Sequence, residues 1–270
     1  AISLGKEARF RVNLFRDHLG AGAVFRLVPS KILTFDQLDL PQIVADFAHL
    51  PKGLVLFTGP TGSGKSTSLA AIIDLINRTQ NKHIVTLEDP IEYVHESKRS
   101  LINQREIGTH TNSFSKALRA ALRQDPDIVL VGELRDLETI QLALEVANTG
   151  HLVFGTLHTA TAMSTIDRLV DIFPAGQQNQ VRTSLSEVLK GIVSQTLCKK
   201  RGGGRVAALE ILVATPAISN LMREGKSSQM MSIMQTGKRE GHRLLNDSLL
   251  QLLHKGIIDY QEAYIKAIDK

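Results

Sequence analysis

The sequence predicts an α/β fold with a mainly parallel central sheet, followed by a helical C-terminal subdomain. Residues 53 to about 213 alternate apolar, strand-like runs with segments of helical periodicity, which is the pattern of parallel βαβ units. After residue 214 the pattern is helical to the end, and glycines and Pro216 mark the predicted helix boundaries. Nine Phe, three Tyr and no Trp indicate a mainly aliphatic core.

Composition and charge narrow the classes of protein. Hydrophobic residues make up 43% and charged residues 22%, as in soluble globular proteins. The net charge of +5 would suit nucleic acid or an anionic membrane surface, and it suits a phosphate-binding enzyme equally well. Cys198, the one cysteine, excludes an internal disulfide and a cysteine-built zinc site. No apolar run approaches a membrane span, and residues 1–20 lack the apolar block of a signal peptide, so we expect a cytoplasmic protein without membrane insertion.

The N-terminal residues 1–29 contain two strand-like runs, ARFRVNLF and GAGAVFRLVP, joined by a turn that contains glycine. So short a piece can hardly bury a core alone, and we expect it to be the end of a domain that begins elsewhere. Residues 30–41, bracketed by Pro29 and Pro41, are predicted to be a linker.

The stretch GPTGSGKST, residues 59–67, matches the phosphate-binding P-loop pattern in full. The buried-strand pattern GLVLFT precedes it and helical spacing follows it, which disfavours the alternative of an ordinary glycine-rich turn. Glycines let backbone N–H groups cradle phosphate oxygens, and the helix that follows adds its N-terminal dipole. Lys65 would neutralise the β- and γ-phosphates, and Ser66 would offer a hydroxyl to Mg²⁺. The predicted nucleotide-binding residues are Gly59, Pro60, Thr61, Gly62, Ser63, Gly64, Lys65, Ser66 and Thr67.

A second strand, DIVLVGE, ends in the carboxylate of Glu133. Burying an unpaired charge is costly, so this acid needs a partner. In P-loop enzymes a second strand end carries an acid beside the γ-phosphate, where it holds Mg²⁺ or its waters and orients the attacking water. We therefore expect Glu133 to be a general base or water-positioning residue, with Gly132 leaving space for a ligand. The alternative is a surface glutamate paired with Arg135.

Two further strand ends carry polar residues. IVTLEDPIEY, residues 84–93, places Glu88, Asp89 and Glu92 around Pro90, whose fixed φ predicts a rigid turn. Three carboxylates repel unless a cation lies nearby, although a solvated acidic turn is the alternative. LVFGTLHT, residues 152–159, brings His158 to a strand end, where it is either structural or close to the γ-phosphate as a sensor of hydrolysis.

Five segments, in this order and spacing, resemble the type II/IV secretion-system ATPase superfamily over nearly all of residues 9–240. GPTGSGKST resembles its Walker A motif, EDPIEY its Asp box, INQREIG a family-typical segment, ALRAALRQDPDIVLVGELRD its atypical Walker B motif, and GTLHT its His box. AISNLMREGK, residues 217–226, resembles a motif of the pilus-retraction branch, with Ser219 where that branch usually has Arg. Assembly and secretion members usually carry a four-cysteine zinc insertion, which Cys198 alone cannot build.

The resemblance implies a RecA-like ATPase core at residues 42–213, a C-terminal helical subdomain at 214–270, and a hinge at 30–41. Residues 1–29 would be the end of a PAS-like domain. ATP would be the substrate with Mg²⁺, and ADP the product. The implied catalytic residues are Glu133 of Walker B, Glu92 of the Asp box and His158 of the His box. Metal contacts, mostly through water, are implied for Ser66, Glu92 and Glu133, and cationic nucleotide contacts for the segment that carries Arg9, Arg11 and Arg26.

The function implied by the resemblance is a homohexameric ATPase motor that retracts type IV pili for twitching motility. It would act on an inner-membrane platform protein from the cytoplasmic face, and without zinc. The alternatives are a pilus-assembly or type II secretion ATPase, a RecA-like nucleic-acid motor, and a non-hydrolysing assembly protein. The sequence lacks the interleaved aromatic and basic residues that suit single-stranded nucleic acid. Retention of Glu133, Glu92 and His158 disfavours a protein that does not hydrolyse nucleotide.

Overall fold

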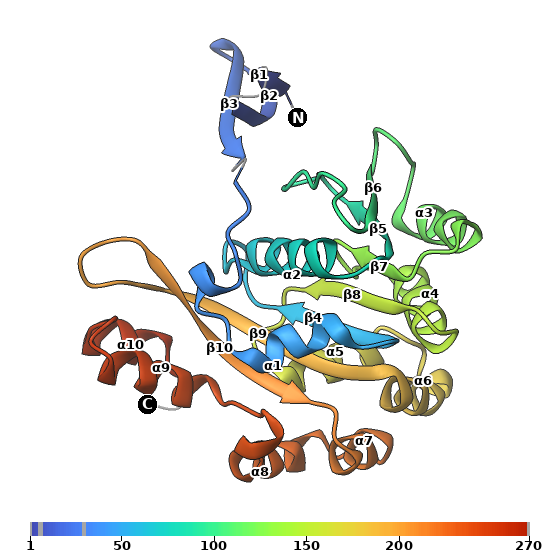
Figure 1. The fold of residues 1–270 in the computed structure, drawn as a ribbon, viewed down its shortest axis with the longest axis vertical. Helices are drawn as coiled ribbons and strands as arrows, with labels where there is room; N and C mark the ends of the chain where they lie inside the picture. The colour runs from blue at the N-terminus through green and yellow to red at the C-terminus, as the bar shows by residue number, and fades with distance from the viewer. Residues whose placement is uncertain (1, 5–7, 29–30, 269–270) are drawn as a thin grey trace.

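The computed structural model describes residues 2–4, 8–28 and 31–268 and contains two sheets (Figure 1). The larger has seven strands in the order β10-β9-β4-β8-β7-β5-β6. Its neighbouring strands are parallel, except for the antiparallel pair β9–β10 at one edge. The predicted α/β fold with a mainly parallel sheet is therefore confirmed. The strands are β4 (Gly53–Thr58), β5 (His83–Glu88), β6 (Leu101–Glu106), β7 (Ile128–Val131), β8 (Leu152–Leu157), β9 (Leu189–Lys199) and β10 (Arg205–Val213).

Helices cover both faces of this sheet, so its central strands are buried along their whole length and are mostly apolar. Side chains alternate between faces, so neighbours on β4 enter different cores. Val55 and Phe57 pack with α1 (Gln42–Asp46), η2 (Phe47–His49) and α2 (Lys65–Thr79). Leu54 and Leu56 pack in a second core on the opposite face. The helices that line that core are α3 (Phe114–Ala121), α4 (Leu137–Asn148), α5 (Ala162–Asp171) and α6 (Ala175–Val188), and the short η3 (Leu122–Gln124) follows α3.

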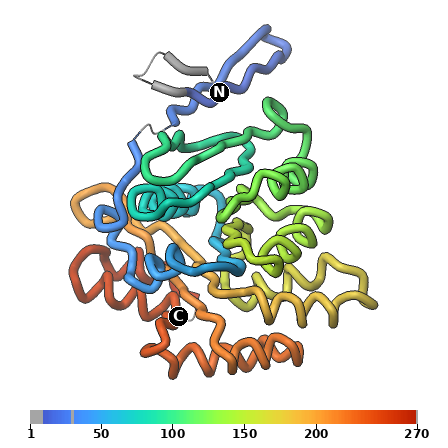
Figure 2. Tube along the Cα trace, turned by 45° about the vertical axis from the view of Figure 1, so that its right-hand side comes forward, coloured from blue at the N-terminus to red at the C-terminus, as the bar shows by residue number. Residues whose placement is uncertain are grey.

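The N-terminal strands β1 (Ile2–Leu4), β2 (Ala8–Asp17) and β3 (Gly20–Val28) form a separate antiparallel sheet. It stands at one end of the molecule, away from the seven-stranded sheet (Figures 1 and 2). Large apolar side chains on it remain exposed, as Leu14 at 75% and Leu27 at 62% illustrate. The two predicted strand-like runs are present, and they do not enclose a core of their own.

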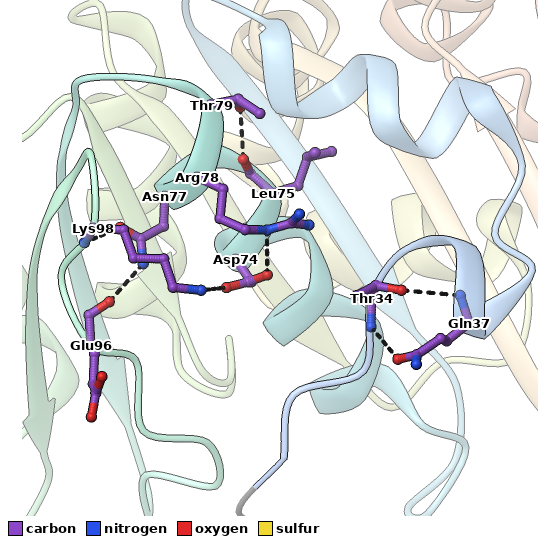
Figure 3. A network of polar contacts seen from close by, with 9 residues as sticks. All are labelled: Thr34, Gln37, Asp74, Leu75, Asn77, Arg78, Thr79, Glu96 and Lys98. Atoms are coloured by element: carbon purple, nitrogen blue, oxygen red, sulfur yellow. Dashed lines mark hydrogen bonds and ion pairs between the residues drawn. The ribbon is translucent and has the colours of Figure 1, made fainter.

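The predicted linker is only partly extended, because its second half packs on the core. Thr34 and Gln37 cap each other before η1 (Asp36–Leu38), with Thr34 N donating to Gln37 Oε1 at 3.0 Å and Gln37 N to Thr34 Oγ1 at 3.3 Å (Figure 3). Phe35 and Leu40 pack against the core that contains α2. The chain is therefore attached to the core from Phe35 onward.

The C-terminal residues are helical, as predicted, but they attach to the core in two places. Helices α7 (Pro216–Arg223) and α8 (Ser227–Thr236) contribute Met222 and Met230 to the core that contains α4 and α6. After η4 (Lys238–Glu240), helices α9 (Leu245–His254) and α10 (Tyr260–Lys266) pack with Cys198 and Ala208 on the β9–β10 hairpin. The basic KKRGGGR stretch forms the turn of that hairpin. In the described ranges, no helix has the length and apolar character needed to cross a membrane.

Candidate active site

The P-loop joins the end of β4 to the start of α2, as the sequence predicts. Gly59, Gly62 and Gly64 have φ of 135°, 80° and 91°, a backbone region that favours glycine. The ammonium of Lys65 lies within the loop and donates to the carbonyls of Gly59 at 2.6 Å and Pro60 at 3.1 Å. Burial lowers the pKa of Lys65, while the charges of Glu133 and Glu92 oppose this effect. The Lys65 ammonium thus rests on backbone oxygens of the loop, which a phosphate could replace as its partner.

A side chain from β9 supports this loop, and sequence reasoning did not identify it. Gln195 is buried, donates from Nε2 to the Ser63 carbonyl at 2.8 Å, and accepts from the Ser68 hydroxyl at 2.9 Å. A Cβ atom added to Gly64 would lie 2.7 Å from Gln195 Nε2. Gly64 therefore serves the packing of the loop on β9 as well as its turn.

Glu133 lies just beyond β7 and meets His158, which lies just beyond β8. Its Oε1 is 3.1 Å from His158 Nε2 and 2.5 Å from Arg135 Nε, and its side chain is 19% exposed. Burial would raise the pKa of Glu133, but the hydrogen bond from Arg135 and the charges of His158 and Arg135 outweigh it, and the pKa is lowered. The carboxylate therefore has both the Arg135 pair of the surface alternative and the neighbours expected of a catalytic acid.

Gly132 has a structural reason for its small size. Its N–H donates to the Leu87 carbonyl at 2.7 Å, and an added Cβ would lie 2.9 Å from that same oxygen. A larger residue would push the end of β7 away from β5. Gly132 also lies in the wall of the candidate cavity, so the space that it leaves is shared between strand packing and the site.

The acids at the end of β5 and just after it divide into one half-buried and two exposed side chains. Glu88 accepts from Thr86 Oγ1 at 2.7 Å, from Gln104 Nε2 at 3.1 Å and from the Glu92 N–H at 3.4 Å. Burial raises the pKa of Glu88, although these hydrogen bonds oppose the shift. Asp89 and Glu92 are exposed. Glu88 thus points inward and shapes the turn, while Glu92 is the acid whose charge acts on Lys65.

The INQREIG segment explains why this turn is held firmly. Gln104 on β6 bonds Glu88, and it also donates to the Tyr93 carbonyl at 2.8 Å. Glu106 Oε2 accepts from the Ile91 N–H at 3.1 Å. Resemblance to the family assigns this segment no role, and the structure shows that it braces the acidic turn from the neighbouring strand.

The loop that continues from this turn is hydrogen-bonded and ion-paired to α2 (Figure 3). Asp74 accepts from Lys98 Nζ at 2.6 Å and from Arg78 Nε at 2.8 Å. Asn77 Nδ2 donates to the Glu96 carbonyl at 2.8 Å, and its Oδ1 accepts from the Lys98 N–H at 2.9 Å. The helix that begins at Lys65 is therefore held to the loop that follows Glu92.

These groups surround one cavity of about 340 Å³. It brings together Lys65, Ser66, Glu92, Glu133 and His158, the central residues of the sequence prediction. Thr61, Gly62 and Glu88 also line it. Gly59, Pro60, Ser63, Gly64 and Thr67 do not line it; the first four belong to the loop around Lys65, and the Thr67 hydroxyl lies 3.0 Å from that of Tyr93.

Arg11 reaches this cavity from the N-terminal sheet. Arg26 lies directly opposite Arg11 in the β2–β3 register but does not line the cavity, and the side chain of Arg9 lies outside the described part of the chain. Two cations in opposed positions repel each other unless an anion lies near them. Of the two, Arg11 is the one that could contact a phosphate-bearing ligand in the cavity.

The donor chemistry of the cavity can accommodate Mg²⁺ together with a nucleotide. In the described residues, no three His, Cys, Asp or Glu side chains gather closely enough to hold a metal by themselves. Mg²⁺ needs no such cluster, because it retains waters and takes its other ligands from substrate phosphates and one or two carboxylates. The Ser66 hydroxyl and the Glu92 and Glu133 carboxylates supply that kind of partial ligand set.

Comparisons of sequence and of structure with known proteins point to the same family. The family model for type II/IV secretion system proteins matches residues 1–265. The chain is 59% identical, over 96% of its length and 76% of the relative's, to the type IV pilus retraction ATPase PilT of Pseudomonas aeruginosa. It is 54% identical, over 99% of its length and 72% of the relative's, to a twitching motility protein of Neisseria gonorrhoeae. A crystal structure of the pilus retraction motor PilT with bound ADP superposes with a TM-score of 0.90 at 52% identity, covering 96% of this chain and 74% of that one.

Proposed function

The chain belongs to the type II/IV secretion system protein family, and from this membership we propose that it is an ATPase motor that couples ATP hydrolysis to type IV pilus retraction and twitching motility. The observation that carries the proposal is the meeting of Lys65, Glu133 and His158 in one cavity beside a complete P-loop. The similarity to PilT, at 59% identity over almost the whole chain, favours retraction over the other activities of the family.

Hydrolysis requires a water oxygen to attack the γ-phosphorus while the bond to the β-phosphate oxygen breaks, giving ADP, phosphate and a proton. Lys65 and the P-loop N–H groups would hold the phosphates. Glu133 would accept a hydrogen bond from the attacking water and orient it. Its lowered pKa keeps the carboxylate ionised and able to accept that bond. His158, 3.1 Å from Glu133, would sense the γ-phosphate through the same carboxylate.

Mg²⁺ fits the site as a partner of the nucleotide. Ser66 would contact it directly, and Glu92 and Glu133 mostly through water. When bound, the ion neutralises charge on the phosphates. The protein's own contribution is to place these oxygens at the ends of α2, β5 and β7, where packing holds them.

The N-terminal sheet would act as a clamp over the nucleotide. Arg11 lines the cavity, and a guanidinium matches phosphate geometry. Loss of phosphate would weaken this contact and allow the sheet to rotate away from the core. We place the hinge before Phe35, because the chain from Phe35 onward packs on the core. Structures of the apo, ADP and ATP-analogue states should differ mainly in the orientation of residues 8–28 relative to residues 42–213, and one fixed orientation in all three would refute the clamp.

We further propose a homohexameric ring that acts on an inner-membrane platform protein from the cytoplasmic side. The zinc-containing assembly and secretion ATPases are a poorer match. Cys198 is buried, and burial raises its pKa to about 11, which opposes the thiolate that a zinc site needs. A nucleic-acid motor finds no support beyond the positive net charge.

Deletion of the gene in the source organism tests the proposal. We expect surface pili to persist while twitching stops, since pili would be made but not retracted. The wild-type gene should restore twitching, and the Glu133→Ala variant should not. Loss of surface pili on deletion would instead indicate an assembly ATPase. Stimulation of the purified enzyme's ATP turnover by DNA would favour a nucleic-acid motor.

A further inference from the structure

A second cavity lies far along the chain from the P-loop, between the segment after α8 and helix α9. It has a volume of about 550 Å³ and a basic lining. Its charged and titratable side chains are Lys238, His242, Arg243, Asp247, His254 and Lys255. Asp247 is its one acid, and that carboxylate is already 3.1 Å from Lys238 Nζ.

Two cations of this cavity have no acidic partner. Neither Arg243 nor Lys255 forms an ion pair with any residue in the described ranges. Arg243 is half-buried as a residue, and Lys255 is exposed. Cations that line one cavity without counter-charges repel one another, and an anion bound there would relieve this repulsion.

His242 adds a buried donor to the same wall. The residue is only 4% exposed. Its Nδ1 accepts a hydrogen bond from the Val213 N–H at 3.2 Å. Burial lowers the pKa of His242, although the nearby Glu240 opposes this. Because Nδ1 accepts the Val213 N–H, the ring proton is assigned to Nε2. That N–H is buried and has no partner among the described residues.

The loop that carries His242 and Arg243 is fixed by the core. The backbones of Arg243 and Ile211 exchange two hydrogen bonds of 2.8 and 2.9 Å. Gly241 has φ of 95°, and an added Cβ would lie 2.7 Å from Ile43 Cγ1 of α1. The cavity therefore sits on a firmly held loop, at the junction between the core and the C-terminal helices.

We propose that this cavity is a binding site for a phosphate group, separate from the nucleotide site. A phosphate offers more acceptor oxygens and more charge than a carboxylate, so it can engage the Arg243 fork and the Lys255 ammonium together, beside His242 in the same lining. Soluble metabolites and lipid headgroups both carry phosphate groups, and both present the same chemistry to these donors.

Pyrophosphate titration provides the test, with Lys65→Ala as the background that disables the P-loop. Binding would be followed through the side-chain nitrogen resonances of ¹⁵N-histidine-labelled protein at constant ionic strength. We expect saturable binding that shifts the His242 Nε2 resonance and weakens by about ten-fold or more in Arg243→Gln, the size of a lost hydrogen bond between charged groups. Arg239→Gln removes the same charge from a neighbouring exposed position outside the cavity and should leave binding unchanged.

The proposal fails if pyrophosphate does not saturate, if acetate binds as tightly, or if Arg239→Gln weakens binding as much as Arg243→Gln does. A melting temperature equal to that of the parent would confirm that Arg243→Gln is folded. The source of the phosphate is decided by co-sedimentation with phosphatidylcholine vesicles that contain phosphatidylglycerol. Arg243-dependent sedimentation assigns a lipid headgroup, and pyrophosphate binding without sedimentation assigns a soluble ligand.

Discussion

The two parts of the molecule that face the nucleotide cavity are built in opposite ways. On the core side, the P-loop and Glu133 follow strands whose residues, such as Val55 and Val129, are fully buried. On the N-terminal side, Arg11 lies on a three-stranded sheet whose apolar residues, such as Leu14, are largely exposed. Packing therefore determines the position of the core groups, whereas little packing determines the position of Arg11. We therefore propose that the core residues carry out ATP hydrolysis, and that the N-terminal sheet moves and changes the contact of Arg11 with the nucleotide.

Replacement of Lys65 by Ala should have the largest effect, because it removes a core group that meets the phosphates before and during hydrolysis. We expect nucleotide affinity to fall by about 100-fold, with turnover lost as well. Calorimetric titration with ADP and an ATP analogue measures this. Equal nucleotide affinity in Lys65→Ala and Glu133→Ala would contradict the separate roles of these two residues.

Glu133→Ala should remove most turnover while nucleotide binding survives, because only the positioning of water is lost. The expected decrease in kcat is roughly 100- to 1,000-fold. Steady-state hydrolysis by the assembled protein is the measurement, and Glu138→Ala is a control on an exposed acid outside the cavity. Wild-type turnover in Glu133→Ala would show that the assignment is wrong.

Arg11→Gln tests the N-terminal half of the comparison. Loss of one guanidinium contact to phosphate should lower kcat/KM by about ten-fold, with an unchanged melting temperature. Arg16→Gln is a matched control, because Arg16 lies on the same strand but not in the cavity. If the two variants behave alike, Arg11 does not contact the nucleotide and the division of roles between the halves is lost.

Arg135→Gln should have the smallest effect, which appears only in the pH dependence. The hydrogen bond from Arg135 helps to lower the pKa of Glu133, so its removal should raise that pKa. The carboxylate would then become protonated at a higher pH, and the acid limb of the kcat profile should move upward in pH. Activity well above that limb should be nearly unchanged. A shift of the limb toward lower pH would contradict the proposed role of ionised Glu133.

Much of the site was predictable from sequence because its parts are local. The stretch GPTGSGKST identifies a P-loop within a few residues, and the structure places its three glycines at positive φ and Lys65 at a helix start. Glu133 and His158 were also predictable, since each ends an apolar run and parallel strands end at one edge of a sheet. The two N-terminal strands and the C-terminal helices followed in the same way from periodicity and turn residues.

The tertiary structure decided which residues support these groups, because support depends on contacts between distant segments. In the sequence, Gln195 has no feature that distinguishes it from other strand residues. Only the pairing of β9 with β4 brings its side chain to the Ser63 carbonyl. Glu88 and Glu92 look alike in sequence, but Gln104 on β6 bonds Glu88, which is half-buried, whereas Glu92 is exposed. Periodicity reports which face of an element is apolar, but the order of strands in the sheet determines what that face meets.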